Sequence, residues 1–256
     1  MAAADTPETV IAVLDSGADL THLELTGRLW THPGEIPWDG IDNDGNLLAD
    51  DVHGYNFHDN HSNPSDASVQ SHGTHVAGVM AAAMNNGQGV AGASPASRVM
   101  VLRVTDTAGT ASTPAILGAI EYAVAMKARG VNVVALNASL AGGVYDFAEA
   151  AAIQAAGNAG IVFCCAAGNT GVDNDAVPNY PGNYRLPNML VAAATDQNKT
   201  GNGELPGAGA GFRGYYLGRD RHVDRLWERS GRCGFPPGSE WRHRADRKGR
   251  PPRFYG

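Results

Sequence analysis

The sequence predicts an α/β fold with a doubly wound, mostly parallel sheet, helices on both faces, and an irregular C-terminal tail. Two observations support this prediction. The apolar runs are short and continuous rather than alternating, which is typical of strands buried on both faces of a parallel sheet. They alternate along the chain with helical stretches, and strand–helix–strand repetition builds such a sheet. The length of 256 residues fits one α/β domain with an extra segment.

We expect five strands and three helices in the first 200 residues. The predicted strands are residues 10–14, 98–104, 131–136, 161–167 and 189–194, and the predicted helices are residues 72–84, 114–128 and 145–156. Pro114, directly after Thr113, marks a helix start because proline fits the first helical turn. Ligands bind at the carboxyl ends of strands in such sheets, and Asp15 and Asn169 both follow predicted strands.

The composition changes near residue 200. Residues 1–200 contain 7 basic and 20 acidic side chains, whereas residues 201–256 contain 12 basic and 6 acidic ones. Glycine and proline make up 17 of the last 56 residues, and only 7 are Leu, Ile, Val or Phe. Such a composition is typical of disorder. We therefore predict an incomplete α/β domain over 1–200 and an Arg/Gly/Pro-rich tail over 201–256 that is disordered or translated out of frame.

Charge, apolar runs and cysteines exclude several classes of protein. The net charge of −7 argues against nucleic acid or an anionic membrane as the main partner. No apolar run approaches the ~20 residues of a membrane span, and the first residues do not read as a signal peptide. The three cysteines do not suggest a disulfide framework, and the adjacent pair Cys164 and Cys165 is interpreted as core packing.

Three residues could together carry out acyl transfer. Asp15 follows a buried strand and precedes Gly17, so its carboxylate sits on a rigid scaffold. His72 lies in the segment SHGTHVAG, at the first turn of a predicted helix, where the helix dipole keeps imidazole neutral and able to accept a proton. The side-chain amide of Asn169 has two donors that could face a developing oxyanion.

Each residue also has a simpler interpretation. Asp15 could be a turn or cap residue, and Asn169 could occupy a left-handed turn beside glycine. His72 and His75 could be core histidines or metal ligands at i and i+3, although a further ligand set such as HExxH is absent.

Four segments in the same order resemble the subtilisin-like serine peptidases (subtilases, peptidase S8). They are VIAVLDSG around Asp15, SHGTHVAGVMAA around His72, NASLAGG at 137–143 and AAGNTG around Asn169, within about residues 8–200. The resemblance implies that Asp15 orients the imidazole, that His72 is the general base and that Asn169 supplies the oxyanion hole. It also implies the chain order acid, histidine, serine.

The resemblance implies a substrate cleft for a polypeptide in an extended conformation. Ser139, Leu140 and Ala141 would pair with the peptide backbone, which supplies affinity without reading sequence. Residues 166–169, including Ala167 and Gly168, would form the other wall of the first specificity pocket. Ala141 stands where the family commonly has glycine, so we expect a narrower pocket. By the same resemblance we expect a secreted or extracellular monomer.

The segment 39–51 predicts a calcium loop. Its oxygen-bearing side chains partly match an EF-hand loop, and so many carboxylates repel each other unless a cation bridges them. The alternative is a solvated acidic loop. The predicted ligands are Asp42, Asp44, Asn46, Asp50 and Asp51, and a looser oxygen cluster comprises Asp59, Asn60, Asn63 and Asp66.

The nucleophile of the family is missing. Subtilases carry it in a Gly-Thr-Ser-Met-Ala-x-Pro element after the oxyanion asparagine, and the 256 residues contain no such element. Ser230 and Ser239 in the tail lack the small-residue helix that would present a hydroxyl to the base. We therefore expect a peptidase domain that is inactive as it stands. The alternative is a protease-dead fragment that binds peptides or calcium.

Overall fold

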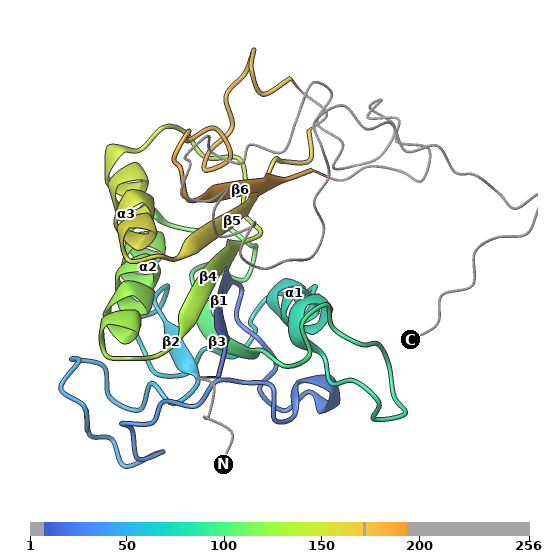
Figure 1. Cartoon of the computed structure of the whole chain (residues 1–256), viewed down its shortest axis with the longest axis vertical. Coiled ribbons are helices and arrows are strands. Elements are labelled where there is room, and N and C mark those ends of the chain that lie inside the picture. The colour runs from blue at the N-terminus through green and yellow to red at the C-terminus, as the bar shows by residue number, and fades with distance from the viewer. Residues whose placement is uncertain (1–7, 171–172, 194–256) are drawn as a thin grey trace, which may run out of the picture. The chain divides into compact units, whose positions relative to one another are not determined.

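The computed structural model describes residues 8–170 and 173–193. Within these residues, six strands form one sheet in the order β2–β3–β1–β4–β5–β6 (Figure 1). All pairings between neighbouring strands are parallel. The strands are β1 Val10–Asp15, β2 Gly54–Asn56, β3 Arg98–Arg103, β4 Val133–Ala138, β5 Val162–Ala166 and β6 Met189–Ala192. Because the sheet is parallel and strands extend to both sides of β1, with β3 and β2 on one side and β4, β5 and β6 on the other, the predicted doubly wound sheet is confirmed.

The helices cover both faces of the sheet. The three α-helices are α1 His72–Ala81, α2 Thr113–Ala128 and α3 Phe147–Asn158, and a short 3₁₀ helix spans Leu23–Leu25. In Figure 1, α2 and α3 lie on one side of the sheet and α1 on the other. None of the described helices has the length and apolar character needed to cross a bilayer.

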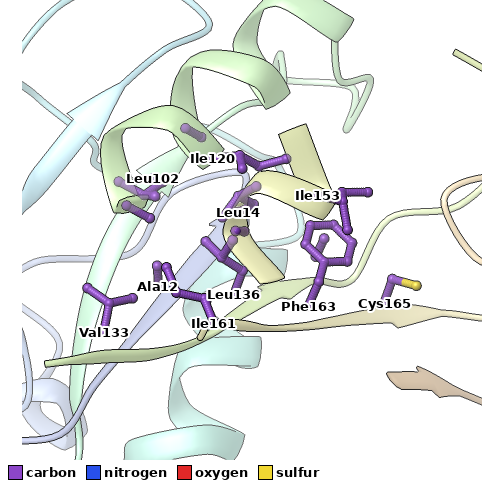
Figure 2. Packing of buried hydrophobic residues seen from close by; sticks show 14 of the residues in the cluster. Ala12, Leu14, Leu102, Ile120, Val133, Leu136, Ile153, Ile161, Phe163 and Cys165 are labelled. Atoms are coloured by element: carbon purple, nitrogen blue, oxygen red, sulfur yellow. The ribbon is translucent and has the colours of Figure 1, made fainter. Parts of the chain in front are cut away.

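Alternating side chains of the strands build a core on each face. Ala12 and Leu14 of β1 belong to the larger core under α2 and α3, whereas Val13 between them belongs to the smaller core under α1. Figure 2 shows the larger core, where Phe163 of β5 lies beside Ile153 of α3. Burial on both faces explains why the strand sequences are continuously apolar.

The starts of α2 and α3 follow from their caps. The hydroxyl oxygen of Ser112 accepts a hydrogen bond from the Ala115 N–H at the start of α2. The Asp146 carboxylate accepts from the N–H groups of Ala148 (2.7 Å) and Glu149 (3.3 Å), so α3 begins two residues after the predicted start at 145. The predicted tail and its boundary at residue 200 lie outside the described residues.

Candidate functional site

A cleft of about 470 Å³ lies at the carboxyl ends of β1, β4 and β5. It brings together most of the residues predicted for catalysis and substrate binding. These are Asp15, His72, Ser139, Leu140, Ala141 and Asn169. They come from segments as far as 154 positions apart in the chain, and they meet because parallel strands end at the same edge of the sheet.

Asp15 and His72 form a close pair. The His72 Nδ1 lies 2.7 Å from the Asp15 Oδ1. An ionised carboxylate only accepts hydrogen bonds, so Nδ1 carries the proton and Nε2 is left able to accept one. The Asp15 side chain is 2% exposed and that of His72 is 51% exposed. The pair therefore has a buried acid that orients a ring open to the cleft.

The Asp15 carboxylate is held by hydrogen bonds at one of its two oxygens. The Ser16 N–H donates to Asp15 Oδ1 at 2.7 Å, the same oxygen that contacts the His72 ring. The other oxygen, Oδ2, is buried and has no hydrogen-bond partner among the described residues. The carboxylate is thus fixed in the orientation that holds the imidazole in place.

A glycine contact lets α1 reach β1. A methyl group at Gly73 would overlap the carbonyl oxygen of Gly17, which follows β1. Gly17 has a φ of +106°, a conformation that glycine adopts without strain. The two glycines therefore allow the first turn of α1 to place His72 beside Asp15. His75 is exposed on the same helix, and neither His72 nor His75 belongs to a group of three or more possible metal ligands among the described residues.

Asn169 and the segment after β4 line the same cleft as the Asp15–His72 pair. Asn169 follows β5 and is exposed, and its amide makes no hydrogen bond to another described residue. Ser139 and Leu140 follow β4, and the Asn137 amide donates to the Ser139 hydroxyl oxygen at 3.0 Å. An amide donor is therefore available in the space that the pair adjoins.

Asn179, which was not predicted as a site residue, bonds to the segment that contains Ala167 and Gly168. Ala167 and Gly168 are buried and do not line the cleft. The Asn179 Oδ1 accepts from the Gly142 N–H at 2.5 Å, and its Nδ2 donates to the Ala167 carbonyl at 3.3 Å. Asn179 therefore bridges the two segments expected to be the walls of the first specificity pocket. The sequence near residue 179 does not predict this role, because the partners of Asn179 lie 12 and 37 positions away.

The cleft has one further wall that was not predicted. Thr105, Thr107, Ala108 and Gly109 line it from the turn that follows β3. The Asp106 carboxylate shapes this turn by accepting from the N–H groups of Ala108 (2.9 Å) and Thr110 (2.8 Å). The Asp-Thr-Ala-Gly sequence is a turn signal that could have indicated a loop at this edge.

Part of the predicted calcium loop forms an acidic cluster. Carboxylate oxygens of Glu35, Asp42 and Asp44 lie within 4.8 Å of one another. The carboxylate of Asp42 also accepts backbone hydrogen bonds from residues 45 to 47. These hydrogen bonds outweigh desolvation and lower the pKa of Asp42. Glu35 was not predicted, since it lies outside the segment 39–51.

The other predicted ligands lie around this cluster rather than in it. The Asp50 carboxylate accepts from the N–H groups of Asp39 (3.1 Å) and Gly40 (3.0 Å). Asp51 is fully buried, and its Oδ2 accepts from Tyr122 (2.6 Å) and from the Asn46 amide (2.9 Å). Burial raises the pKa of Asp51. Its Oδ1 has no hydrogen-bond partner among the described residues.

The looser oxygen cluster does not form as one group. Asp59 pairs with Arg103, with Oδ2 and Nη2 3.1 Å apart. Asp66 instead contacts Thr74 at the start of α1. The two carboxylates therefore have separate roles.

Known proteins match this chain in sequence. Thermitase from Thermoactinomyces vulgaris is 34% identical over 188 residues, which cover 73% of this chain and 55% of thermitase. The thermophilic serine proteinase of Bacillus sp. (strain AK1) is 33% identical over 187 residues, covering 73% of this chain and 38% of the proteinase. The chain thus spans about half the length, or less, of these two relatives.

Solved structures share the fold. Sphericase matches with a TM-score of 0.59 and 25% identity, over 76% of this chain and 56% of sphericase. A cold adapted subtilisin-like serine proteinase matches with a TM-score of 0.53 and 25% identity, over 74% of this chain and 56% of that one. Residues 6–233 match the sequence profile of the Subtilase family. From this match and the shared fold, we conclude that the chain belongs to the subtilase family.

Proposed function

We propose that this chain is a serine endopeptidase domain of the subtilisin-like class that, as sequenced, binds polypeptides without cleaving them. The observation that carries the proposal is the 2.7 Å Asp15–His72 pair in one cleft with Asn169. Family membership supports peptide-bond hydrolysis as the reaction of the class. It also supports an extended polypeptide as partner and a location outside the cell.

Each residue of the cleft has one role in the peptide-bond hydrolysis of this class. Asp15 holds the imidazole with Nδ1–H toward it, so Nε2 of His72 is free to take a proton from a nucleophile and return it to the leaving amine. The Asn169 amide would donate to the oxyanion that develops on the scissile carbonyl. Backbone groups of 139–141 would pair with the substrate strand and hold that carbonyl in place.

The cleft lacks a nucleophile among the described residues. No described residue places a serine hydroxyl within hydrogen-bond distance of the His72 ring, and the whole sequence lacks the family's serine element. Without a nucleophile no acyl-enzyme forms, although binding and oxyanion groups remain.

Two measurements on the full chain test this proposal. A fluorophosphonate probe should leave every serine unlabelled, and labelling of any serine would show that the chain has a nucleophile. Calorimetry should detect binding of an extended peptide. Leu140→Pro should weaken binding, because it removes a backbone N–H from the pairing segment. Equal binding by the variant would exclude pairing at that N–H.

We also propose that Glu35, Asp42 and Asp44 bind a structural calcium ion. Clustered carboxylates are the hard oxygen ligands that calcium prefers. Asn46 links the cluster to Asp51, because its N–H donates to both Asp42 (3.0 Å) and Asp44 (3.0 Å) while its amide donates to Asp51. A nearby cation would offset the cost of the buried Asp51 oxygen that lacks a partner. Arg129 contacts Asp44 and already offsets part of the negative charge, and the His32 Nε2 lies 3.4 Å from the same carboxylate.

Calcium titration tests the assignment. Saturating calcium should raise the free energy of unfolding, by about 2.7 kcal/mol at a concentration 100 times the dissociation constant. Glu35→Gln should weaken binding by on the order of tenfold or more, because ligand charge tunes calcium affinity. Asp59→Asn, outside the cluster, is the control. A calcium effect that survives Glu35→Gln unchanged would contradict the proposed ligand set.

A further inference from the structure

Asp66 is a half-buried carboxylate that does not line the cleft but lies next to it. It accepts five hydrogen bonds. Its Oδ1 accepts from the Ser16 hydroxyl (2.9 Å), the Ser68 hydroxyl (2.9 Å) and the Ser68 N–H (3.0 Å). Its Oδ2 accepts from the Thr74 hydroxyl (2.6 Å) and the Thr74 N–H (2.9 Å). One side chain thus connects the residue after Asp15 with the first turn of α1.

The hydroxyls of Ser16 and Ser68, which donate to Asp66, also accept hydrogen bonds from the backbone at His72 and Gly73. A hydroxyl has one proton, and donating it to Asp66 leaves the oxygen lone pairs to accept. The Ser68 oxygen accepts from the His72 N–H at 3.0 Å, and the Ser16 oxygen accepts from the Gly73 N–H at 2.9 Å. The two hydroxyl oxygens lie 3.2 Å apart. Both N–H groups beside the catalytic ring are therefore held by hydroxyls whose orientation Asp66 sets.

The same carboxylate completes the helix start. The first N–H groups of a helix lack intrahelical partners, and the preceding residue, Ser71, makes no side-chain cap hydrogen bond. Asp66 replaces that cap through the Thr74 N–H. The Thr74 oxygen, oriented by Asp66, accepts from the Asp19 N–H at 2.9 Å, which ties the segment after β1 to α1.

We propose that Asp66 is the positioning residue of the Asp15–His72 pair. It holds the end of β1 and the start of α1 together through Ser16, Ser68 and Thr74. The proposal rests on the proposed function, in which His72 acts as the base. Because all five partners of Asp66 are donors, only a group that accepts at both oxygens satisfies them. An asparagine has the same shape, but its NH₂ group is itself a donor and would face the donors that one of the Asp66 oxygens now accepts from.

Nuclear magnetic resonance of the full chain tests this proposal without needing activity. The hydrogen-bonded Nδ1–H of His72 should give a low-field proton resonance in the parent chain, assigned by its loss in His72→Gln. Asp66→Asn should shift this resonance upfield or abolish it through exchange with water. The amides of His72 and Gly73 should also exchange about tenfold faster, as expected for the loss of one hydrogen bond.

Asp19→Asn is the matched control. It removes a charge close to Asp66, but among the described residues the Asp19 carboxylate accepts hydrogen bonds from Thr21 alone, so the resonance should stay in place. An unchanged resonance in folded Asp66→Asn would overturn the proposal. Should Asp66→Asn fail to fold, Ser68→Ala removes the acceptor of the His72 N–H, and an unchanged resonance there would overturn it equally. A parent chain without the resonance would instead count against the Asp15–His72 pair and so against the proposed function.

Discussion

Gly73 determines how closely α1 approaches β1, and so where the ring of His72 lies. A methyl group there would overlap backbone of Gly17, which cannot move without shifting the end of β1. Gly78 lies in the same helix, and a methyl group there would meet nothing within 4 Å. The two glycines offer a matched pair of substitutions in one element.

Gly73→Ala should destabilise the protein by about 1–3 kcal/mol, because the added methyl overpacks a backbone contact. Gly78→Ala should stabilise it by about 0.5–1 kcal/mol, because alanine favours the helix and has room. Denaturant unfolding measures both values. Equal effects of the two substitutions would show that the contact between α1 and Gly17 is not tight.

Asp66 should also affect stability at low pH. Burial opposes its ionisation, but hydrogen bonds from Thr74, Ser68 and Ser16 outweigh burial and lower the pKa of Asp66 below its usual 3.8. A carboxylate with a lowered pKa in the folded state stabilises that state above its unfolded pKa, and the contribution is lost as pH falls through the folded pKa. The nearby Asp19 also has a lowered pKa, caused first by its hydrogen bonds with Thr21.

The gap in unfolding free energy between the parent chain and Asp66→Asn should therefore be constant at neutral pH and shrink below about pH 4. Unfolding curves at a series of pH values measure it. A gap that stays constant down to pH 2 would show that the ionised carboxylate is not what Asp66 contributes.

At this scale the sequence identified Asp15 and His72, because a strand end and a glycine-rich helix start are local patterns. Glu35 could not be found in the same way. Its carboxylate accepts from the N–H groups of Asn43 and Asp50, which lie 8 and 15 positions away. Asn179 and Asp66 likewise depend on partners that only the folded chain brings close.

Among the elements, β2 and the short 3₁₀ helix Leu23–Leu25 were missed, and the other strands and helices were predicted within a few residues. β2 has three residues, Gly-Tyr-Asn, too short and polar to show a strand pattern. It forms because it pairs with β3, where a methyl group at Gly54 would overlap the Val101 carbonyl. Helix α1 ends at Ala81, before the predicted residue 84. Ala82 has a ψ of 144°, which is not helical, and the Ala83 N–H donates to the Glu24 carbonyl at 2.9 Å instead of to a carbonyl of the helix.

The start of α3 depends on a buried tyrosine and glutamate. The Tyr184 hydroxyl lies 2.8 Å from Glu149 Oε2 and accepts from the Asp146 N–H at 2.9 Å. Burial raises the pKa of Glu149, and the hydrogen bond from Tyr184 opposes this rise. Loss of the hydroxyl would leave a buried carboxyl oxygen without this donor.

Tyr184→Phe should therefore lower the free energy of unfolding by about 1–3 kcal/mol, the cost of an unsatisfied buried group. Tyr145→Phe, in the same aromatic cluster but exposed, should change it by less than about 0.5 kcal/mol. Thermal or denaturant unfolding of both variants checks this. A neutral Tyr184→Phe would mean that water replaces the hydroxyl without cost.

For the molecule as a whole, alternation of strands and helices predicted the fold class, and the structure comparisons confirm it. The strand order could not be predicted, because alternation does not determine which strands become neighbours. That order places β1 at the centre, so the end of β1 at Asp15 lies between those of β3 and β4. The domain boundary at residue 200 and the disordered or out-of-frame tail after it stay predictions, and the family match extends past that boundary to residue 233.

The central claim is that an acid, an imidazole and an amide from separate segments face one peptide-sized cleft. Titrating an extended peptide into isotope-labelled full chain, and following the backbone and side-chain resonances, tests it most directly. We predict that the resonances of His72, Asn169 and residues 139–141 shift together with one dissociation constant. Shifts confined to another surface would contradict the claim. One such surface is the groove between α2 and α3, which is lined by Leu117, Val124, Ala148 and Ala155 among others.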